Sequence, residues 1–390
     1  MKIERFHYYF KLYLTTLFIF ASYFLVQKYN NPVEWTISEW LINYQGGFTR
    51  RGLIGEIIYQ SNKLLNFTFR ELILILQILS YFFYYSLIYS YIKNLKINHL
   101  LIFSIFSPLF IAYPIAEVEV LARKEIFLFI SFIVIANLFS NQKIKNSHYI
   151  SYSLILTLLT LIWEGVIIYL SFFIFILLIK NNFILSNNFL LKLSLSFFPV
   201  LVSFYFIVNF KLNQQEVQIM CNSVGECYGA MTYLTNDLAS NISEVKSKIK
   251  FSYIIRYFLI FLIGFLPLLL LIYKSEFSFK KKFNYRKQFT LAFILIFLPT
   301  LSFFYVAQDW GRWINISYTL SLFTYIYCIK NKFIKFYGYN SNFKYLSNKT
   351  LILTLFVIFS FGWSPKTLIN EDVSSIPVFR KAITIIKNSL

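Results

Sequence analysis

The stretch from Asn43 to Glu56, NYQGGFTRRGLIGE, combines residue types that suit an anionic ligand. The adjacent Arg50 and Arg51 supply charged donors, and the guanidinium fork matches the oxygens of a phosphate. The four glycines of the stretch permit tight turns and let backbone N–H groups come close to a ligand. The alternative is a simple turn before a membrane span, with the arginines reaching for lipid headgroups.

A second charged segment, EVEVLARKE, contains Arg123 and Lys124, which we interpret as further phosphate ligands. Glu119 and Arg123 are four residues apart and would pair with each other on a helix. The alternative is a short solvated loop whose charges neutralise one another.

Glu164 stands alone between two apolar runs, in the sequence LTLIWEGVIIYL. Desolvation raises the pKa of a carboxyl group and a nearby arginine lowers it, which is the tuning that a general base or acid needs. Glu164 is therefore a candidate catalytic residue. The alternative is a structural ion pair with Arg123 or Arg312.

The motif QDWGRW supplies Asp309 as a second candidate base, and Arg312 as another ligand for an anionic substrate. Trp310 and Trp313 flank the arginine, and we expect them to stack on a sugar ring or a prenyl headgroup. The alternative is an aromatic belt at the membrane surface with a local ion pair.

Cys221 and Cys227 flank the residues NSVGE in a predicted outer loop. An oxidising outer compartment favours a disulfide between them, and without nearby histidines they do not make a zinc site. We therefore predict no metal site and no cofactor. The three histidines map to the opposite membrane edge, which disfavours a histidine-dependent mechanism at the outer face: His7, His99 and His148.

The composition indicates an all-α, polytopic transmembrane helical bundle. Of the 390 residues, 58% are hydrophobic and 14% are charged, whereas soluble domains have about 25% charged residues. The apolar runs predict about eleven spans. The net charge of +20 is interpreted as cytoplasmic-loop charge that orients the chain, so no nucleic-acid partner is expected and membrane lipids are.

The predicted topology is a single membrane domain, 1–390, with a cytoplasmic N-terminus that carries Lys2 and Arg5. Two long outer loops, 27–70 and 211–250, and an outer tail, 364–390, complete it. The segment VEWTISEWLINY has the pattern of a short helix lying in the membrane interface, and a short amphipathic helix is predicted at 378–387. The predicted spans are 8–26, 71–92, 100–116, 126–139, two within 149–179, 189–210, 251–273, 289–307, 314–329 and 350–363.

The apolar stretch 149–179 is long for one span and short for two. We favour two segments that meet at Glu164 on the outer edge. A single tilted helix with a buried Glu164 is the alternative, and it would invert everything downstream. The two-segment topology puts all four charged motifs on one face, and the cost of each charge near lipid favours one common cavity.

This arrangement of spans, long outer loops and outer charged clusters resembles the Wzy-like polysaccharide polymerases and the broader GT-C membrane glycosyltransferases. The resemblance extends over nearly the whole chain. It implies an enzyme of the bacterial inner (cytoplasmic) membrane that acts on a polyprenyl-pyrophosphate-linked glycan, such as an O-antigen or capsule precursor, at the periplasmic face. In GT-C enzymes an acidic residue of the first outer loop commonly serves the acceptor, and Glu34 and Glu39 are the candidates here. The outer-loop histidine of the related O-antigen ligases is not found.

The resulting hypothesis is glycosyl transfer, with Glu164 or Asp309 accepting the proton of the acceptor hydroxyl. The residues expected to hold the pyrophosphate and the glycan are Arg50, Arg51, Arg123, Lys124, Arg312 and Trp313. A transporter or flippase for an anionic lipid-linked substrate is the alternative. No protein partner is predicted from the sequence.

Overall fold

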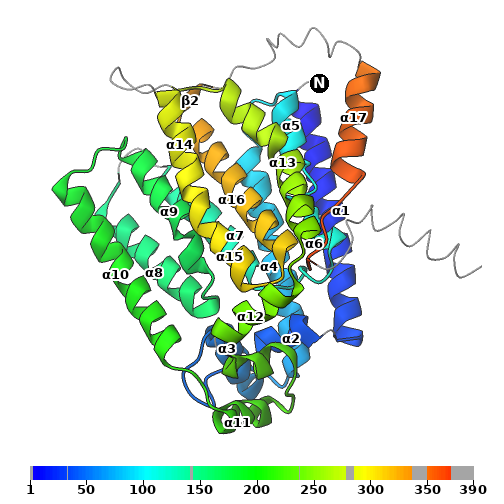
Figure 1. Cartoon of the computed structure of the whole chain (residues 1–390), viewed down its shortest axis with the longest axis vertical. Helices are drawn as coiled ribbons and strands as arrows, with labels where there is room; N and C mark the ends of the chain where they lie inside the picture. Colours follow the sequence, from blue (N-terminus) through cyan, green and yellow to red (C-terminus); the bar gives the residue numbers. More distant parts are fainter. Residues whose placement is uncertain are drawn as a thin grey trace, which may run out of the picture. The chain divides into compact units, whose positions relative to one another are not determined.

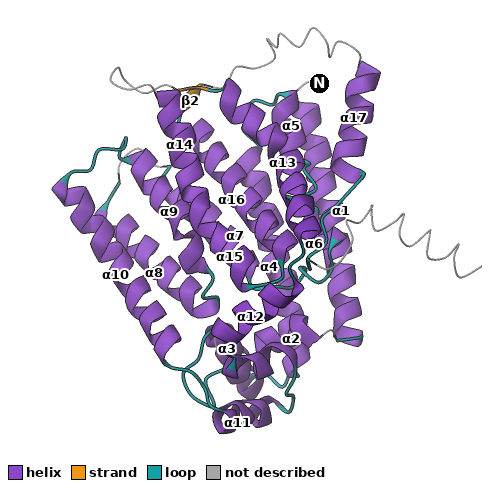
Figure 2. Cartoon of the chain, in the orientation of Figure 1, coloured by secondary structure: helices purple, strands orange, loops and turns teal. Residues whose placement is uncertain are grey.

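The computed structural model describes residues 3–32, 34–140, 144–236, 238–277, 285–335 and 349–369. Apart from one short antiparallel pair, β1 (Glu276–Phe277) and β2 (Ile334–Lys335), its regular elements are helices (Figure 2). The predicted tail helix at 378–387 lies outside the described residues.

The chain divides into two compact units. Unit 2 consists of Tyr9–Lys93 and Leu121–Ser240. Unit 1 consists of Met1–Tyr8, Asn94–Val120 and Asn241–Leu390. Each unit is thus assembled from segments that are distant in the sequence.

Unit 2 holds most of the first helix, the two short helices of the first predicted outer loop, and the beginning of the second outer loop (Figure 1). Its helices are α1 (Ile3–Asn30), α2 (Glu34–Leu41), α3 (Gly52–Leu64), α4 (Phe69–Ile92), α7 (Glu125–Leu138), α8 (Asn146–Ile162), α9 (Val166–Lys180), α10 (Asn187–Asn209), α11 (Gln214–Val224) and the 3-10 helix η1 (Gly229–Thr235).

Unit 1 is built around α16, whose residues from Trp310 to Cys328 are all buried. Its helices are α5 (His99–Ile105), α6 (Tyr113–Ala116), most of α12 (Leu238–Lys248), α13 (Phe251–Lys274), α14 (Tyr285–Phe297), η2 (Leu298–Ser302), α15 (Phe303–Val306), α16 (Trp310–Lys330) and α17 (Lys349–Phe361).

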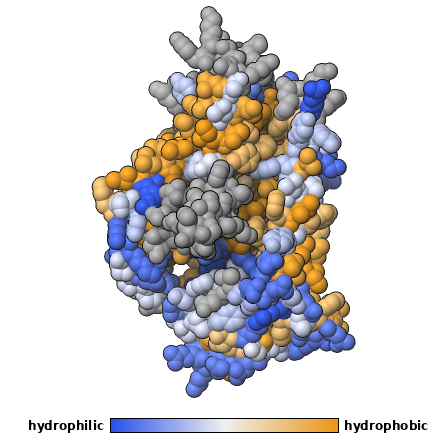
Figure 3. Space-filling view, turned by 90° about the vertical axis from the view of Figure 1, so that its right-hand side faces the viewer, coloured by the Kyte–Doolittle hydropathy of each residue, from blue (hydrophilic) through white to orange (hydrophobic). Residues whose placement is uncertain are grey.

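Four described helices are long and apolar enough to cross a membrane, as a helical membrane protein requires. They are Arg5–Asn30 within α1, and α4, α10 and α13. Figure 3 shows broad apolar areas on one face of the molecule, with hydrophilic side chains gathered toward its lower end. Such apolar surface is what lipid-facing helices expose.

Other predicted spans correspond to shorter or interrupted helices. The predicted span 100–116 is broken into α5 and α6, because Pro108 and Pro114 lack the backbone N–H and disfavour helix in the residue before them. The predicted span 289–307 changes from α-helix to 3-10 helix around Pro299 for the same reason. Apolarity alone therefore overestimated the continuity of these segments.

The stretch 149–179 forms two helices, as the favoured interpretation predicts. α8 ends at Ile162, Trp163 adopts an extended conformation with φ −157° and ψ 111°, and α9 begins at Val166. α8 packs against both α9 and α10. Glu164 consequently lies in a turn between two helices and not inside a tilted one.

The first predicted outer loop forms the predicted short helix, α2, but most of its side chains are buried in unit 2, whereas the sequence predicted an exposed interfacial helix. Ile37 and Trp40 are 4% and 0% exposed. The segment η1 of the second outer loop packs on α2, where the Ser38 hydroxyl accepts a 2.9 Å hydrogen bond from the backbone N–H of Ala230. Figure 1 shows α2, α3 and α11 gathered at the same end of unit 2. The two loops therefore cover each other.

The contact between α3 and the end of α2 requires glycine at position 55. A Cβ atom there would lie 1.9 Å from the carbonyl oxygen of Ile42 and 2.8 Å from that of Trp40. Alanine normally favours a helix over glycine by about 1 kcal/mol. Despite this preference, we expect Gly55→Ala to destabilise the fold by about 1–3 kcal/mol, because the backbones of α2 and α3 must separate to make room for the added Cβ atom.

Thermal unfolding in detergent measures this effect. Ser61→Ala, later in α3, is the matched control and should leave the unfolding temperature nearly unchanged. A stabilised Gly55→Ala variant would contradict the close contact between α2 and α3.

Candidate functional site

The carboxylate of Glu39 is the buried centre of a charged cluster in unit 2. Its side chain is fully buried, and its two oxygens accept hydrogen bonds from two different arginines. Arg51 Nη1 lies 3.3 Å from Oε1, and Arg123 Nη1 lies 3.2 Å from Oε2. Glu39, on α2, therefore brings together two arginines that are distant from each other in the sequence.

Glu164 binds the other side of Arg51. Arg51 Nε lies 2.9 Å from both carboxylate oxygens of Glu164, and Arg51 Nη2 lies 2.6 Å from Oε1. The Glu164 side chain is 19% exposed, in contrast to the fully buried Glu39. Arg51 thus has one inaccessible carboxylate partner and one that solvent or a ligand can reach.

Lys124 and Arg50 complete the group that we call the charged cluster: Glu39, Arg50, Arg51, Arg123, Lys124 and Glu164. The ammonium of Lys124 is fully buried and donates a 2.6 Å hydrogen bond to the backbone carbonyl of Arg51. Arg50 Nη2 donates a 2.8 Å hydrogen bond to the carbonyl of Tyr233 in η1. The second predicted outer loop is therefore tied to the same cluster.

Two residues in and beside the cluster have strained backbones. Arg51 has φ 64° and Ala122 has φ 79°, in the left-handed region that side chains other than glycine rarely adopt. Ala122 is held there by Trp40, whose indole Nε1 donates a 2.6 Å bond to its carbonyl, and by Tyr81, whose hydroxyl accepts its N–H at 3.4 Å. Lys28 donates a 3.3 Å hydrogen bond to the carbonyl of Leu121, the residue before Ala122. Strain that the surroundings maintain in this way is characteristic of functional sites.

Three helix N-termini meet at the cluster. Arg51 is the N-cap of α3, Lys124 is the N-cap of α7, and Glu164 directly precedes Gly165, the N-cap of α9. None of the three N-caps makes a side-chain capping hydrogen bond. Helix N-termini carry a partial positive charge, so they favour a nearby anion.

The cluster carries more positive than negative charge. When the adjoining buried Lys28 and Glu125 are included, five cationic side chains stand against three carboxylates, a surplus of two positive charges when Lys124 is protonated. Arg123 is 9% exposed, and its Nε has no hydrogen-bond partner among the described residues. The site thus has unused capacity for an anion.

The pKa values of the cluster follow from burial and from the neighbouring charges. Burial raises the pKa of Glu164, but the charge and hydrogen bonds of Arg51, with the charge of Arg50, outweigh it and leave this pKa below its usual value. Burial lowers the pKa of Arg50. Burial lowers the pKa of Lys124 to about 7, against the attraction of Glu39 and Glu164. Lys124 therefore changes its charge near neutral pH.

The predicted residues Asp309 and Arg312 lie in unit 1 and pair with each other at 2.7 Å. Arg312 is 4% exposed and lies 4.8 Å from the ring centroid of Trp313, whose other contacts include a stacked Phe303 at 4.3 Å. In the same unit, Lys366 lies 3.6 Å from Glu117. This is a second, separately held charged group, in which one cation accompanies each carboxylate.

The structure changes two of the predicted pairings. The segment between Ala116 and Glu125 is not helical, so Arg123 pairs with Glu39 and not with Glu119 through a helical turn. Glu164 pairs with Arg51, where Arg123 and Arg312 were the predicted alternatives. Both differences arise because the folded chain brings the first loop against residues that the sequence placed far away.

The second outer loop contains a disulfide between Cys221 and Cys227. Beside it, Glu226 forms a 2.7 Å ion pair with Arg70 at the start of α4. The disulfide closes the segment between α11 and η1 on itself, and the ion pair joins that segment to α4.

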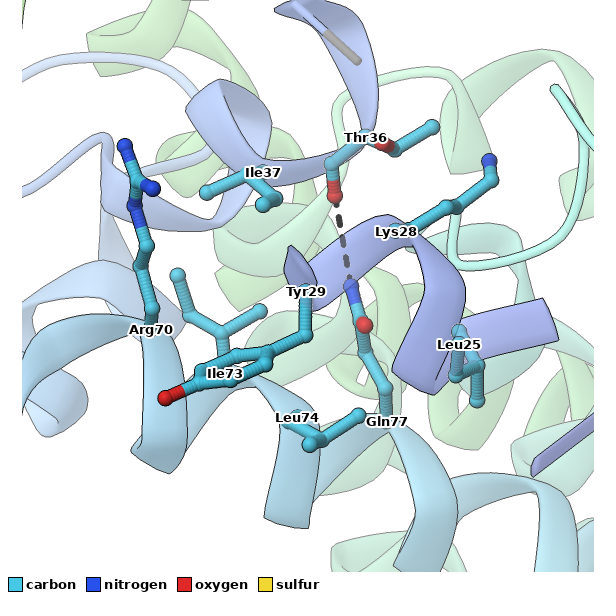
Figure 4. A pocket seen from close by; sticks show the side chains of 9 residues that line it. All are labelled: Leu25, Lys28, Tyr29, Thr36, Ile37, Arg70, Ile73, Leu74 and Gln77. Carbon is cyan, nitrogen blue, oxygen red and sulfur yellow. Dashed lines mark hydrogen bonds between the residues drawn. The ribbon is translucent and has the colours of Figure 1, made fainter. Parts of the chain in front are cut away.

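A small pocket adjoins the cluster between α1, α2 and α4 (Figure 4). Gln77 donates a 3.2 Å hydrogen bond to the carbonyl of Thr36 across it, and Lys28 is on its wall. The pocket has room for about one water molecule. The pocket therefore supports α2 and is too small for a sugar.

The sequence identified Arg50, Arg51, Arg123, Lys124 and Glu164, and the structure brings these five together. The sequence did not identify Glu39 as the buried partner of Arg51 and Arg123, although the regular spacing of apolar residues around Glu39 in VEWTISEWL could have indicated that its side chain is buried. The meeting of three helix N-termini has no sequence signal. Comparison of the chain with protein-family models, with curated proteins and with solved structures finds no match.

Proposed function

We propose that this chain is a membrane glycosyltransferase of surface-polysaccharide assembly, which acts on a polyprenyl-pyrophosphate-linked glycan. The observation that carries the proposal is the surplus of positive charge formed by Arg50, Arg51, Arg123 and Lys124 where α3, α7 and α9 begin. A diphosphate is the anion that such a site suits, because it offers several oxygens to the forked donors of arginine. Three of the four candidate membrane helices, α1, α4 and α10, belong largely to the same unit as the cluster, which suits a substrate with a lipid tail.

The proposed reaction begins with an exchange of partners at Arg51. The diphosphate takes the place of Glu164 on Arg51, while the buried Glu39 continues to hold the arginine. Without Arg51, Glu164 is a partly buried carboxylate whose pKa rises, so it becomes a better base. Glu164 then takes the proton of the acceptor hydroxyl.

In the transfer step, the acceptor oxygen forms a bond to the anomeric carbon, and the bond from that carbon to the diphosphate oxygen breaks. The electron pair of this bond leaves with the polyprenyl diphosphate. Arg51, Arg123 and Lys124 stabilise the negative charge that develops there, which is the role of a preorganised cationic site. Asp309 is not assigned to this step, because it pairs with Arg312 in unit 1.

The proposed topology completes this arrangement. The four long helices and the four shorter apolar ones supply eight crossings, and α8, α16 and the broken segment of α5 and α6 bring the proposed total to about eleven. The N-terminus lies in the cytoplasm of a bacterial cell, and the charged cluster faces the periplasm. The shorter apolar helices are α7, α9, α17 and the segment Leu291–Val306.

Lys124 predicts a pH dependence of substrate binding. Its pKa of about 7 means that it is charged below pH 7 and neutral above. We expect the affinity for a sugar-linked diphosphate lipid to fall roughly tenfold between pH 6 and pH 9, because a hydrogen bond to a charged group contributes about 1.5–3 kcal/mol. Binding in lipid nanodiscs at a series of pH values measures this.

Lys124→Met is the control for this prediction. It should bind the lipid more weakly at pH 6 and show a flat pH profile, and an unchanged profile in the variant would exclude Lys124 as the cause.

A rise in pH should change the stability of the fold in the direction opposite to its effect on binding. The folded state holds fewer protons than the unfolded state between pH 7 and the ordinary lysine value of 10.5, so this group's contribution to stability rises with pH in that range.

A flippase is the second candidate, and the interior of α16 favours it. Between Asn315 and Ser321 of this buried helix, four polar atoms have no hydrogen-bond partner among the described residues: Asn315 Oδ1, Ser317 Oγ, Thr319 Oγ1 and Ser321 Oγ. Polar groups along the depth of a membrane helix are typical of a transport path.

Purified protein in proteoliposomes with a lipid-linked oligosaccharide separates the two functions. A new glycosidic linkage in the product, detected by mass spectrometry, supports the transferase. Movement of the intact lipid between leaflets, without a change in the glycan, supports the flippase. A protein that does neither would remove both proposals.

A further inference from the structure

Two aromatic side chains, one from each outer loop, form an open pair beside the charged cluster. Trp35 of α2 and Tyr233 of η1 have ring centroids 4.7 Å apart, with their planes tilted by 56°. Trp35 is partly exposed and Tyr233 is 39% exposed, whereas Trp40 on the same helix α2 is completely buried. The pair therefore offers aromatic surface to a ligand, which the packed core does not.

Each member of the pair is held by a cation of the cluster. The guanidinium of Arg123 lies 5.8 Å from the ring centroid of Trp35, while its Nη1 binds Glu39. Arg50 holds Tyr233 through the backbone carbonyl, so the phenol ring is not used in that contact. The aromatic surface is thus joined directly to the arginines proposed to bind a diphosphate.

The chemistry of such a surface suits a pyranose ring. An aromatic face carries partial negative charge, and the C–H groups on one side of a sugar carry partial positive charge, so the two stack. Both residues lie outside the candidate membrane spans, in segments that pack on each other. An aromatic belt at the lipid surface would instead place its rings on the spans.

We propose that Trp35 and Tyr233 form a sugar subsite, which seats the first ring attached to the diphosphate. The proposal rests on the proposed function, because the cluster must bind the diphosphate. It adds the part of the site that recognises a glycan and distinguishes a loaded lipid carrier from an empty one. A diphosphate held by Arg123 would place its sugar over the adjacent Trp35.

The test compares two defined lipids in nanodiscs: undecaprenyl diphosphate and undecaprenyl-diphosphate-linked N-acetylglucosamine. We expect the unmodified protein to bind the sugar-bearing lipid about tenfold more tightly. Trp35→Ala and Tyr233→Ala should reduce this ratio to about one, while the affinity for undecaprenyl diphosphate stays within twofold. Retained binding of the bare lipid also shows that each variant is folded.

Trp35→Phe keeps an aromatic face and should preserve most of the preference. Tyr205→Ala, which removes an exposed tyrosine from the candidate span α10, should preserve all of it. A preference that survives Trp35→Ala and Tyr233→Ala, or an unmodified protein that binds both lipids equally, overturns the subsite and leaves the proposed function standing. Failure of the unmodified protein to bind either lipid overturns both.

Discussion

Glu164→Gln should lower the rate of glycosyl transfer by about 10²–10⁴-fold, the usual contribution of a general base. The amide has the shape of the carboxylate and can still accept a hydrogen bond from Arg51, so the fold is preserved. It cannot take a proton from the acceptor hydroxyl. Because the amide also competes less well for Arg51, we expect the diphosphate lipid to bind at least as tightly as before.

The measurement is the turnover of lipid-linked oligosaccharide by purified protein, together with the affinity for the lipid. Glu39→Gln is the matched control, because both carboxylates bind Arg51. Glu39 is fully buried between two arginines, so its replacement leaves their charges poorly compensated and should reduce stability and lipid affinity. Normal turnover by Glu164→Gln would exclude Glu164 as the base.

Arg51→Ala should reduce catalytic efficiency by about 10²–10³-fold, because it removes a donor that stabilises the leaving diphosphate. It also leaves Glu39 and Glu164 without their shared partner. Removing one member of a buried ion pair costs about 3–5 kcal/mol, and the 24% exposure of the Arg51 side chain places the expected loss at the lower end of that range. Activity and unfolding should therefore both change.

Two further variants separate these effects of Arg51. In the double variant Arg51→Ala with Glu164→Gln, one uncompensated carboxylate is gone, so stability should partly return while activity does not. Arg70→Ala removes the arginine of the more exposed pair with Glu226 in the same unit, and it should cost at most about 1 kcal/mol. If Arg51→Ala were no more harmful than Arg70→Ala, the cluster would have no special role.

The sequence by itself determined the helical membrane character and most of the chemistry of the cluster. Long apolar runs can satisfy their backbone groups in lipid only as helices, so their class follows from composition. The break at Glu164 was also predictable, because a charged residue followed by glycine in an apolar stretch favours a turn at the membrane edge. Arg50 and Arg51 were conspicuous for the same reason, since charge near hydrocarbon is costly.

Only the tertiary structure decided which charges pair. It also decided which helix N-termini lie near those charges. The first loop places Glu39 between Arg51 and Arg123 and brings Arg51 to Glu164, across 113 positions of sequence. Ion pairs between distant segments depend on how those segments pack, and a sequence pattern reports only neighbours within a helical turn or two. For this reason the arginines could be named from the sequence, whereas the pairing of Glu39 with Arg51 and Arg123 and the position of the three helix N-termini could not.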